Sequence, residues 1–239
     1  MSASPQLAKA KKAIKPTKSS LKPQQKGPLG GTAYDRILRA IVEGDYEPGD
    51  RILEDEIAGQ LSISRTPVRE GLRRLEDEGI LVHEPHRGMT VVKLDYQMVQ
   101  ELYSVRGLLE GAAAARAARY ATDADMALLE DVVGREPLAT KSSAAMAAHN
   151  TRFHHAIYAA AHNRYLLKTL SVLANPLALL SKTAFSSPER RAAAMLEHRK
   201  IFDAIQARDP EKAEFEAREH LRSAQKMRLQ IFAEMRNTT

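Results

Sequence analysis

The chain of 239 residues contains no cysteine and no tryptophan, and only 5% of its residues are aromatic. The lack of cysteine excludes disulfides, thiolate metal ligands and cysteine nucleophiles. No apolar run approaches the roughly 18 residues needed to cross a bilayer, and the N-terminus lacks the apolar stretch of a secretory signal. These absences predict a cytoplasmic protein that has no membrane partner.

The short motifs that carry common enzyme chemistry are also missing. The sequence contains no HExxH, nucleophile elbow, P-loop or GxGxxG. What it does contain, 44% apolar and 28% charged residues, is typical of a globular protein with packed cores. We therefore expect a globular protein that is not an enzyme.

The net charge of +6 comes from one end of the chain. Residues 1–31 contain seven lysines and no acid, so the remaining residues sum to −1. This tail is rich in Pro, Ser, Gln and Lys, and cannot bury enough apolar surface to fold. It is predicted to be disordered, either as a solubilising extension or as a segment that binds phosphates non-specifically.

Residues 32–94 have the pattern of a winged helix-turn-helix. Apolar residues at helical spacing predict three helices, of which the second covers 54–61 and the third 64–78. Pro67 is compatible with the third helix because it lies in the first turn. Two β-prone runs, 80–83 and 89–94, flank a tip with Pro and Gly and predict a hairpin. Three helices followed by a hairpin define this fold.

From residue 95 to 239 the pattern is helical throughout, without a strand signal. Cap residues and first-turn prolines mark several of the helix starts. The expected architecture is a mainly α protein whose second part is an all-helical bundle for ligand binding and dimerisation. The predicted helices cover roughly 97–120, 123–134, 139–161, 164–183, 188–207 and 210–236.

The third predicted helix carries cations on one side. Its apolar stripe faces inward, which leaves three arginines at spacings of four on the other side: Arg65, Arg69 and Arg73. Such a face can enter the major groove, where arginine pairs with guanine and Thr66 reaches a phosphate or base edge. The alternative is a solvated basic face partly paired with Glu70 and Glu76. Residues 32–93 hold nine basic and thirteen acidic residues, so DNA affinity must come from local placement.

The stretch "PGDRILEDEIAGQLSISRTPVREGLRRLEDEGILVHEPHRGMTVV" resembles the N-terminal domain of GntR-family bacterial transcription regulators. The resemblance implies that a homodimer binds double-stranded operator DNA. It assigns base and backbone contacts to Arg65, Thr66 and Arg69. It also places the hairpin tip, His86, Arg87 and Gly88, in the minor groove.

Three histidines on separate predicted helices, His154, His198 and His220, are candidates for a binding site in the second half. Asn150 lies four residues before His154, hence on the same helix face. Three imidazoles and one side-chain oxygen suit Zn, Ni, Fe or Mn and leave positions open. The alternative is that each histidine is a packed core residue with a hydrogen bond.

"NTRFHHAIYAAAHN", "EHRKIFDAIQARDP" and "AREHLRSAQ" are similar to three segments of the FCD effector domain of the FadR subfamily. The resemblance implies a divalent metal held by Asn150, His154, His198 and His220, with Asn150 standing where the family usually has Asp. It also places Arg106 at a position that often faces the effector cavity, where a guanidinium can clamp a carboxylate. A salt bridge to Glu110 is the alternative for Arg106.

The combined prediction is a ligand-responsive transcription regulator. We expect a repressor that a small organic acid releases from a pseudo-palindromic operator. Two alternatives remain: a DNA-architectural protein whose helical part only dimerises, and a metal-dependent hydrolase.

Overall fold

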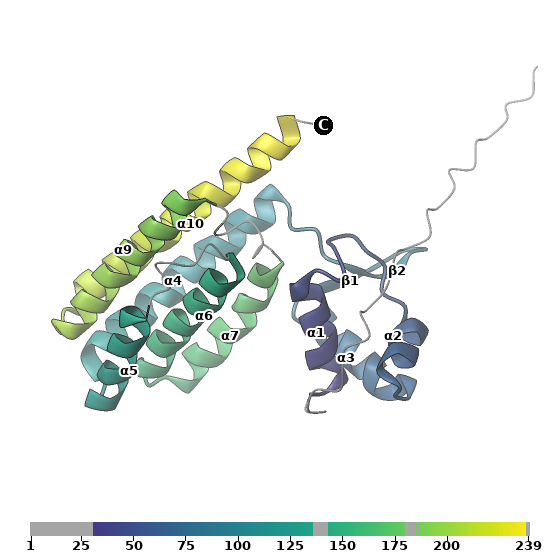
Figure 1. The fold of residues 1–239 in the computed structure, drawn as a ribbon, viewed down its shortest axis with the longest axis horizontal. Helices are drawn as coiled ribbons and strands as arrows, with labels where there is room; N and C mark the ends of the chain where they lie inside the picture. Colours follow the sequence, from purple (N-terminus) through teal and green to yellow (C-terminus); the bar gives the residue numbers. More distant parts are fainter. Residues whose placement is uncertain (1–30, 136–142, 180–184, 186, 238–239) are drawn as a thin grey trace, which may run out of the picture.

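The computed structural model describes residues 31–135, 143–179, 185 and 187–237. The predicted disordered tail lies almost wholly outside this part of the chain. Figure 1 shows two units side by side. We call α1 to β2 the winged-helix unit and α4 to α10 the helical bundle. The predicted fold class, mainly α with a winged helix-turn-helix followed by a helical bundle, is confirmed.

Local signals in the sequence explain where the first three helices begin and end. A capping box between Thr32 and Asp35 starts α1, Ala33–Glu43, and Gly44 ends it in the left-handed conformation at φ 85°. Helix α2 covers Glu54–Leu61, the range predicted from periodicity. Helix α3, Arg65–Asp77, follows the extended residue Ser64.

The core of the winged-helix unit forms where α1 and α3 cross. Ile37, Val68 and Leu75 are at most 1% exposed, and they pack with the apolar residues of α2 and the hairpin. At the crossing, a Cβ on Gly71 would lie 2.9 Å from the backbone nitrogen of Tyr34. Only glycine permits this close approach, which fixes how α3 sits on α1.

The hairpin is present and slightly displaced from its predicted ranges. Strands β1, Leu81–Glu84, and β2, Gly88–Val91, pair antiparallel with Leu81 opposite Val91. Ile80, predicted in the first strand, instead precedes it as a fully buried residue. We call residues 81–91 the wing.

The predicted helices of the second part are present. Residues 139–142 and 180–183, which the prediction included in two helices, lie outside the described residues. No described helix has the length and hydropathy required to cross a membrane. The helices are α4 Tyr96–Tyr120, α5 Asp123–Gly134, α6 Ser143–Ala160, α7 Arg164–Ala178, α9 Pro188–Gln206 and α10 Pro210–Asn237.

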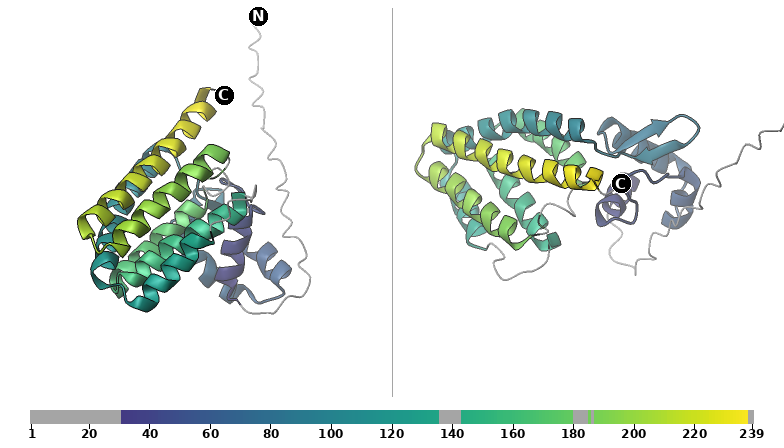
Figure 2. Two further views of the ribbon diagram at one scale, coloured as in Figure 1. Left: turned by 60° about the vertical axis from the view of Figure 1, so that its left-hand side comes forward. Right: turned by 90° about the horizontal axis from the view of Figure 1, so that it is seen from above.

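Helix α4 lies at the centre of the bundle, where it packs against α6, α7, α9 and α10. Figure 2 shows α9 and α10 running along one side of it. The buried face of α4 consists largely of alanines that are fully inaccessible, among them Ala114 and Ala117. Small side chains let the neighbouring backbones approach closely, and larger residues such as Phe153 and Phe202 fill the remaining core.

Polar contacts of Asn175 connect the two units. Asn175 of α7 donates to the carboxylate of Glu78, at the end of α3, at 2.7 Å. Tyr34 of α1 donates to the same oxygen at 2.5 Å. Burial and the hydrogen bond to Glu78 raise the pKa of Tyr34 to about 12, so its hydroxyl remains a donor. Leu179 also packs against the core of the winged-helix unit.

Candidate DNA-binding surface and candidate metal centre

The arginines of α3 are exposed, as expected for a DNA-reading face. The side chains of Arg65 and Arg69 are 66% and 58% exposed, and Thr66 and Arg73 are also exposed. Asp55 and Glu54, at the start of α2, accept from them: Arg65 at 2.6 Å, and Arg69 through two nitrogens at 2.8 and 3.2 Å. The acids named in the alternative, Glu70 and Glu76, were therefore the wrong partners.

These ion pairs do not block DNA binding. Exposed pairs contribute at most about 1 kcal/mol, so phosphate or guanine can replace the carboxylates. The first turn of α3 holds no acid, and the Ser64 side chain makes no cap hydrogen bond. The first N–H groups of a helix lack intrahelical acceptors, so this end of α3, which also carries Arg65 and Arg69, is suited to an anion.

The wing presents a short tip with unusual backbone geometry. His86 and Gly88 both have positive φ, 64° and 77°, which turns the chain sharply between the strands. Arg87 pairs with Glu84 at 2.8 Å and donates to the carbonyl of Gly49 at 3.2 Å. The guanidinium is therefore held between Glu84 at the end of β1 and the backbone of Gly49.

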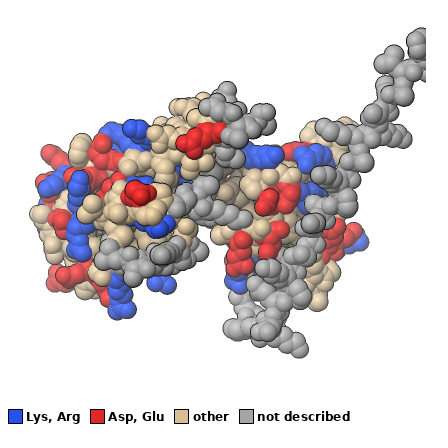
Figure 3. Space-filling view, turned by 45° about the horizontal axis from the view of Figure 1, so that its top comes forward, with Lys and Arg blue, Asp and Glu red and all other residues tan. Residues whose placement is uncertain are grey.

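Basic and acidic side chains are intermixed over both units on the face in Figure 3. This agrees with the excess of acids in the sequence of the winged-helix unit. Affinity for DNA must then depend on the local geometry of α3 and the wing, because the unit has no broad positive field.

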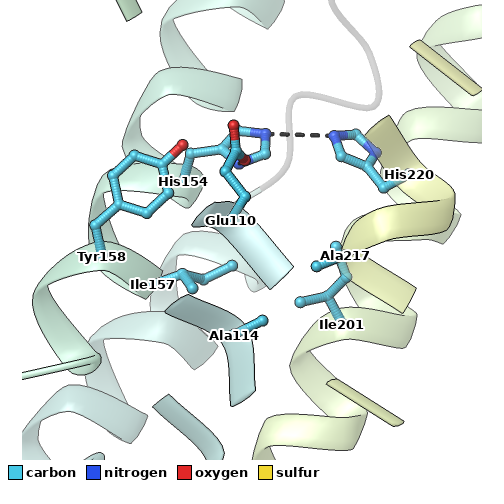
Figure 4. A pocket seen from close by; sticks show the side chains of 8 residues that line it. All are labelled: Glu110, Ala114, His154, Ile157, Tyr158, Ile201, Ala217 and His220. Carbon is cyan, nitrogen blue, oxygen red and sulfur yellow. Dashed lines mark hydrogen bonds and ion pairs between the residues drawn. The ribbon is translucent and has the colours of Figure 1, made fainter. Parts of the chain in front are cut away.

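The three predicted histidines converge inside the bundle. His154 of α6, His198 of α9 and His220 of α10 are 8%, 1% and 3% exposed, and each offers a ring nitrogen within 4.8 Å of the others. The Nε2 atoms of His154 and His220 face each other at 3.3 Å (Figure 4). His198 stacks on Phe153 with ring centroids 4.1 Å apart.

In two of these rings, the Nδ1 nitrogen contacts a carboxylate. Glu110 of α4 lies 2.9 Å from Nδ1 of His154, and Glu197 of α9 lies 2.7 Å from Nδ1 of His220. Each carboxylate also pairs with an arginine. Arg106 contacts Glu110 at 2.6 Å, and Arg190 contacts Glu197 at 2.8 Å.

Burial favours the neutral form of two of these imidazoles, those of His198 and His220. Desolvation lowers the pKa of His220 to about 4, although its hydrogen bond to Glu197 acts in the opposite direction. Desolvation and the neighbouring His220 and His154 also hold the pKa of His198 well below its usual value. Burial would raise the pKa of Glu110, but Arg106 and His154 pull it well below normal. At neutral pH the site thus combines the neutral imidazoles of His198 and His220 with the ionised carboxylate of Glu110.

This donor set fits a divalent transition metal. Metals bind neutral imidazole, and two nitrogens at about 2.0–2.1 Å from a tetrahedral Zn²⁺ lie about 3.4 Å apart, close to the 3.3 Å between the Nε2 atoms. Asn150, the predicted oxygen ligand, is half-buried one turn before His154 on α6. His154, His198 and His220 would hold the ion, and its Lewis acidity would attract an anionic ligand.

Arg106 forms the salt bridge that the sequence left open as the alternative to an effector contact. It is 7% exposed, and its Nε and Nη2 atoms lie 2.7 and 2.6 Å from one oxygen of Glu110. A direct contact between Arg106 and an effector remains a prediction.

The neutral histidines predict that acid destabilises the metal-free protein. With the pKa of His220 at about 4, the unfolded chain binds a proton between about pH 6.5 and 4 that the folded chain does not. The free energy of unfolding therefore decreases as the pH decreases through this window, by about 2 kcal/mol at pH 5 for this residue. Urea unfolding of chelator-treated protein at pH 7.5 and 5.0 measures the change. If the free energy of unfolding is the same at both pH values, His220 is not held in the neutral form.

Several residues of this site could not be predicted from the sequence. Glu197 and Arg190 were not singled out, because their contact with His220 depends on how α9 packs against α10. Glu110 was named only as a partner of Arg106, and its second contact with His154 depends on the packing of α4 against α6. The one available signal was Glu197 directly before His198 in the sequence.

A winged-helix unit with an exposed basic helix, joined to a bundle in which three buried histidines converge, is the architecture of a DNA-binding regulator. Residues 29–91 match the family described as "Bacterial regulatory proteins, gntR family", and residues 101–223 match the "FCD domain". The chain belongs to the GntR family of bacterial transcription regulators, in the group that carries an FCD domain.

Individual relatives agree with this assignment. A probable D-xylose utilization operon transcriptional repressor of Paenarthrobacter nicotinovorans is 33% identical over 189 residues, 78% of this chain and 83% of the relative. The uncharacterised regulator YdhC of Bacillus subtilis is 26% identical over 75% of this chain and 82% of its own length. A GntR regulator from Rhodococcus sp. RHA1 shares the fold, with a TM-score of 0.68, 22% identity, and coverage of 80% and 93% of the two chains. These relatives are regulators rather than enzymes, as predicted.

Proposed function

We propose that this regulator is a cytoplasmic repressor that leaves its operator when a small organic acid binds at a divalent metal in the bundle. His154, His198 and His220 hold the metal, with Asn150 as an oxygen ligand. The observation that carries the proposal is the convergence of three buried imidazoles on one point, where burial holds His198 and His220 in the neutral form. The Paenarthrobacter relative is described as a probable repressor of a D-xylose utilization operon, which supports this direction of regulation.

The operator is read by a homodimer. Arg65, Thr66, Arg69 and Arg73 contact the major groove, and the wing tip with His86, Arg87 and Gly88 contacts the minor groove. Support for dimerisation comes from three large apolar side chains along one side of α4 that are 36%, 45% and 57% exposed: Met98, Val105 and Leu108. A second copy would bury this stripe.

An ion held by His154, His198, His220 and Asn150 would keep its full charge, because imidazole and amide ligands are neutral. It would therefore attract the carboxylate of the effector. Arg106 is neutralised by Glu110 in this conformation, so it meets the effector only if that carboxylate moves away. Rearrangement of the bundle reaches the winged-helix unit through Asn175, which holds the end of α3 through Glu78.

The size of the cavity favours a second candidate function. The space lined by Glu110, His154, Tyr158 and His220 is about 10 Å³, enough for one water molecule but not for an organic acid (Figure 4). A bundle that stays closed would serve only dimerisation, and the protein would bind DNA without an effector. Repression controlled by an acid requires that α4, α6 and α10 separate on binding.

Thermal unfolding with added metals and acids distinguishes the two functions. Chelator-treated protein is mixed with Zn²⁺, Ni²⁺, Fe²⁺ or Mn²⁺, and then with a panel of hydroxy acids, sugar acids and dicarboxylates. A ligand present at 100 times its dissociation constant stabilises the fold by about 2.7 kcal/mol, which is a shift of several degrees in Tm. We expect one metal to raise Tm and at least one acid to raise it further only with that metal.

Two results would contradict parts of the proposal. If no metal changes Tm, the proposed metal centre is wrong, and so is the proposed acid site that depends on it. A Tm that responds to metal but to none of the acids would favour the effector-independent DNA-binding protein.

A further inference from the structure

The two carboxylates behind the histidines form matched chains of contacts. One runs from Arg106 through Glu110 to Nδ1 of His154, and the other from Arg190 through Glu197 to Nδ1 of His220. We propose that Glu110 and Glu197 are positioning residues of the metal centre, which fix the tautomer and the direction of the two imidazoles. This inference rests on the metal site proposed above.

The contacts determine where the protons of the two rings lie. An ionised carboxylate only accepts hydrogen bonds, so Nδ1 of each ring must carry the hydrogen. With its hydrogen on Nδ1, a neutral imidazole has a free lone pair on Nε2, which a metal can accept. The Nε2 atoms of His154 and His220 lie 3.3 Å apart, a separation that fits two nitrogens bound to one metal ion.

The arginines keep both carboxylates ionised inside the protein. Glu110 is 3% exposed, a degree of burial at which an isolated carboxyl group would be protonated and would lose its accepting role. A cation lies against each carboxylate and favours its ionised form: Arg106 contacts Glu110 at 2.6 Å, and Arg190 contacts the less buried Glu197 at 2.8 Å. Each arginine–glutamate pair has zero net charge, so the pairs orient the ligands without reducing the attraction of the ion for an anionic effector.

Glu110 is more deeply buried than Glu197, so the two carboxylates require different variants. The Glu197 side chain is 20% exposed, whereas Glu110 and Arg106 are almost fully enclosed. Glu197→Gln is thus the milder change. Gln can offer its N–H₂ or its oxygen to Nδ1, so it no longer selects one tautomer. Removing Glu110 alone would leave the charge of Arg106 buried and unpaired, and the double variant Arg106→Met/Glu110→Gln avoids this.

Zinc affinity is measured on the full-length protein by competition with a chromophoric chelator. Glu197→Gln and the double variant are each expected to bind zinc about 10–100-fold more weakly than the wild type. The matched control is Glu214→Gln, which breaks an exposed ion pair with Arg218 on α10 and touches none of the three histidines. Its zinc affinity is expected to equal that of the wild type. Circular dichroism melts establish that each variant is folded.

A second readout separates positioning from simple packing. Nitrogen chemical shifts of the imidazoles in metal-free protein report the tautomer of each ring. We expect the Nδ1–H form of His220 in the wild type and in Glu214→Gln, and a mixture of forms in Glu197→Gln. Wild-type affinity for zinc together with an unchanged tautomer in Glu197→Gln would overturn the inference.

Failure of the metal site itself gives a different result. If the wild type binds no zinc, the proposed metal centre is wrong, while the tautomer measurement still decides whether Glu197 orients His220. If Glu197→Gln fails to fold, the double variant and its effect on His154 decide the matter in the same way.

Discussion

Replacing His198 with alanine is expected to lower the zinc affinity of the protein by at least about 100-fold and to abolish its response to organic acids. The reason is that one of three converging imidazoles is lost, an effect larger than the 10–100-fold typical of residues behind the ligands. His198 lies in the bundle, far in sequence from the reading helix, so binding to operator DNA without effector should persist. Chelator competition and fluorescence anisotropy on labelled operator measure the two properties.

His155→Ala is the matched control. This histidine is exposed and adjacent to His154 on α6, and zinc affinity should not change. His198 also stacks on Phe153, and its removal costs packing energy. Two results together would show that His198 is a core residue and not a ligand. The wild type would have no measurable affinity for zinc, and His198→Ala would lose both its folding and its operator binding.

Replacing Arg69 with alanine is expected to weaken operator binding by about 1–3 kcal/mol and to relax base preference at one position in each half-site. Arg69 is exposed on the first turns of α3, and its two-nitrogen contact with Glu54 displays the same fork geometry that guanine would accept. Titration of operator and of variants with single base changes measures both effects.

Arg39→Ala on α1 provides the comparison, because it removes an exposed arginine of the same unit away from α3. It should have little effect on specific binding. If Arg69→Ala loses the same amount of affinity for operator DNA and for random DNA, Arg69 contacts a phosphate and not a base.

Much of the fold could be predicted because its signals are local. The boundaries of α2 follow from apolar spacing alone, and α9 starts at Pro188 where Ser187 caps it. The side of α3 that carries Arg65 and Arg69 follows from the burial of Val68 and Leu75 on the other side. These features depend on residues within a few positions of one another.

The site could be predicted only in part, since it depends on contacts between distant segments. Spacing made His154, His198 and His220 candidates, and their convergence required the packing of three helices. The acids that pair with Arg65 and Arg69 were missed for the same reason. The sequence suggested Glu70 and Glu76, acids of the same helix, whereas the turn between α2 and α3 brings Asp55 and Glu54 to Arg65 and Arg69.

The central claim is that α3 reads a specific operator under the control of the histidine centre. Selection of bound sequences from a random DNA library by the zinc-loaded protein, with and without the acid that raises its Tm most, tests it directly. The account predicts enrichment of one two-fold symmetric sequence, which the acid suppresses and Arg69→Ala weakens. A library that shows no enriched sequence, or an enriched sequence whose recovery neither acid nor chelator alters, would contradict it.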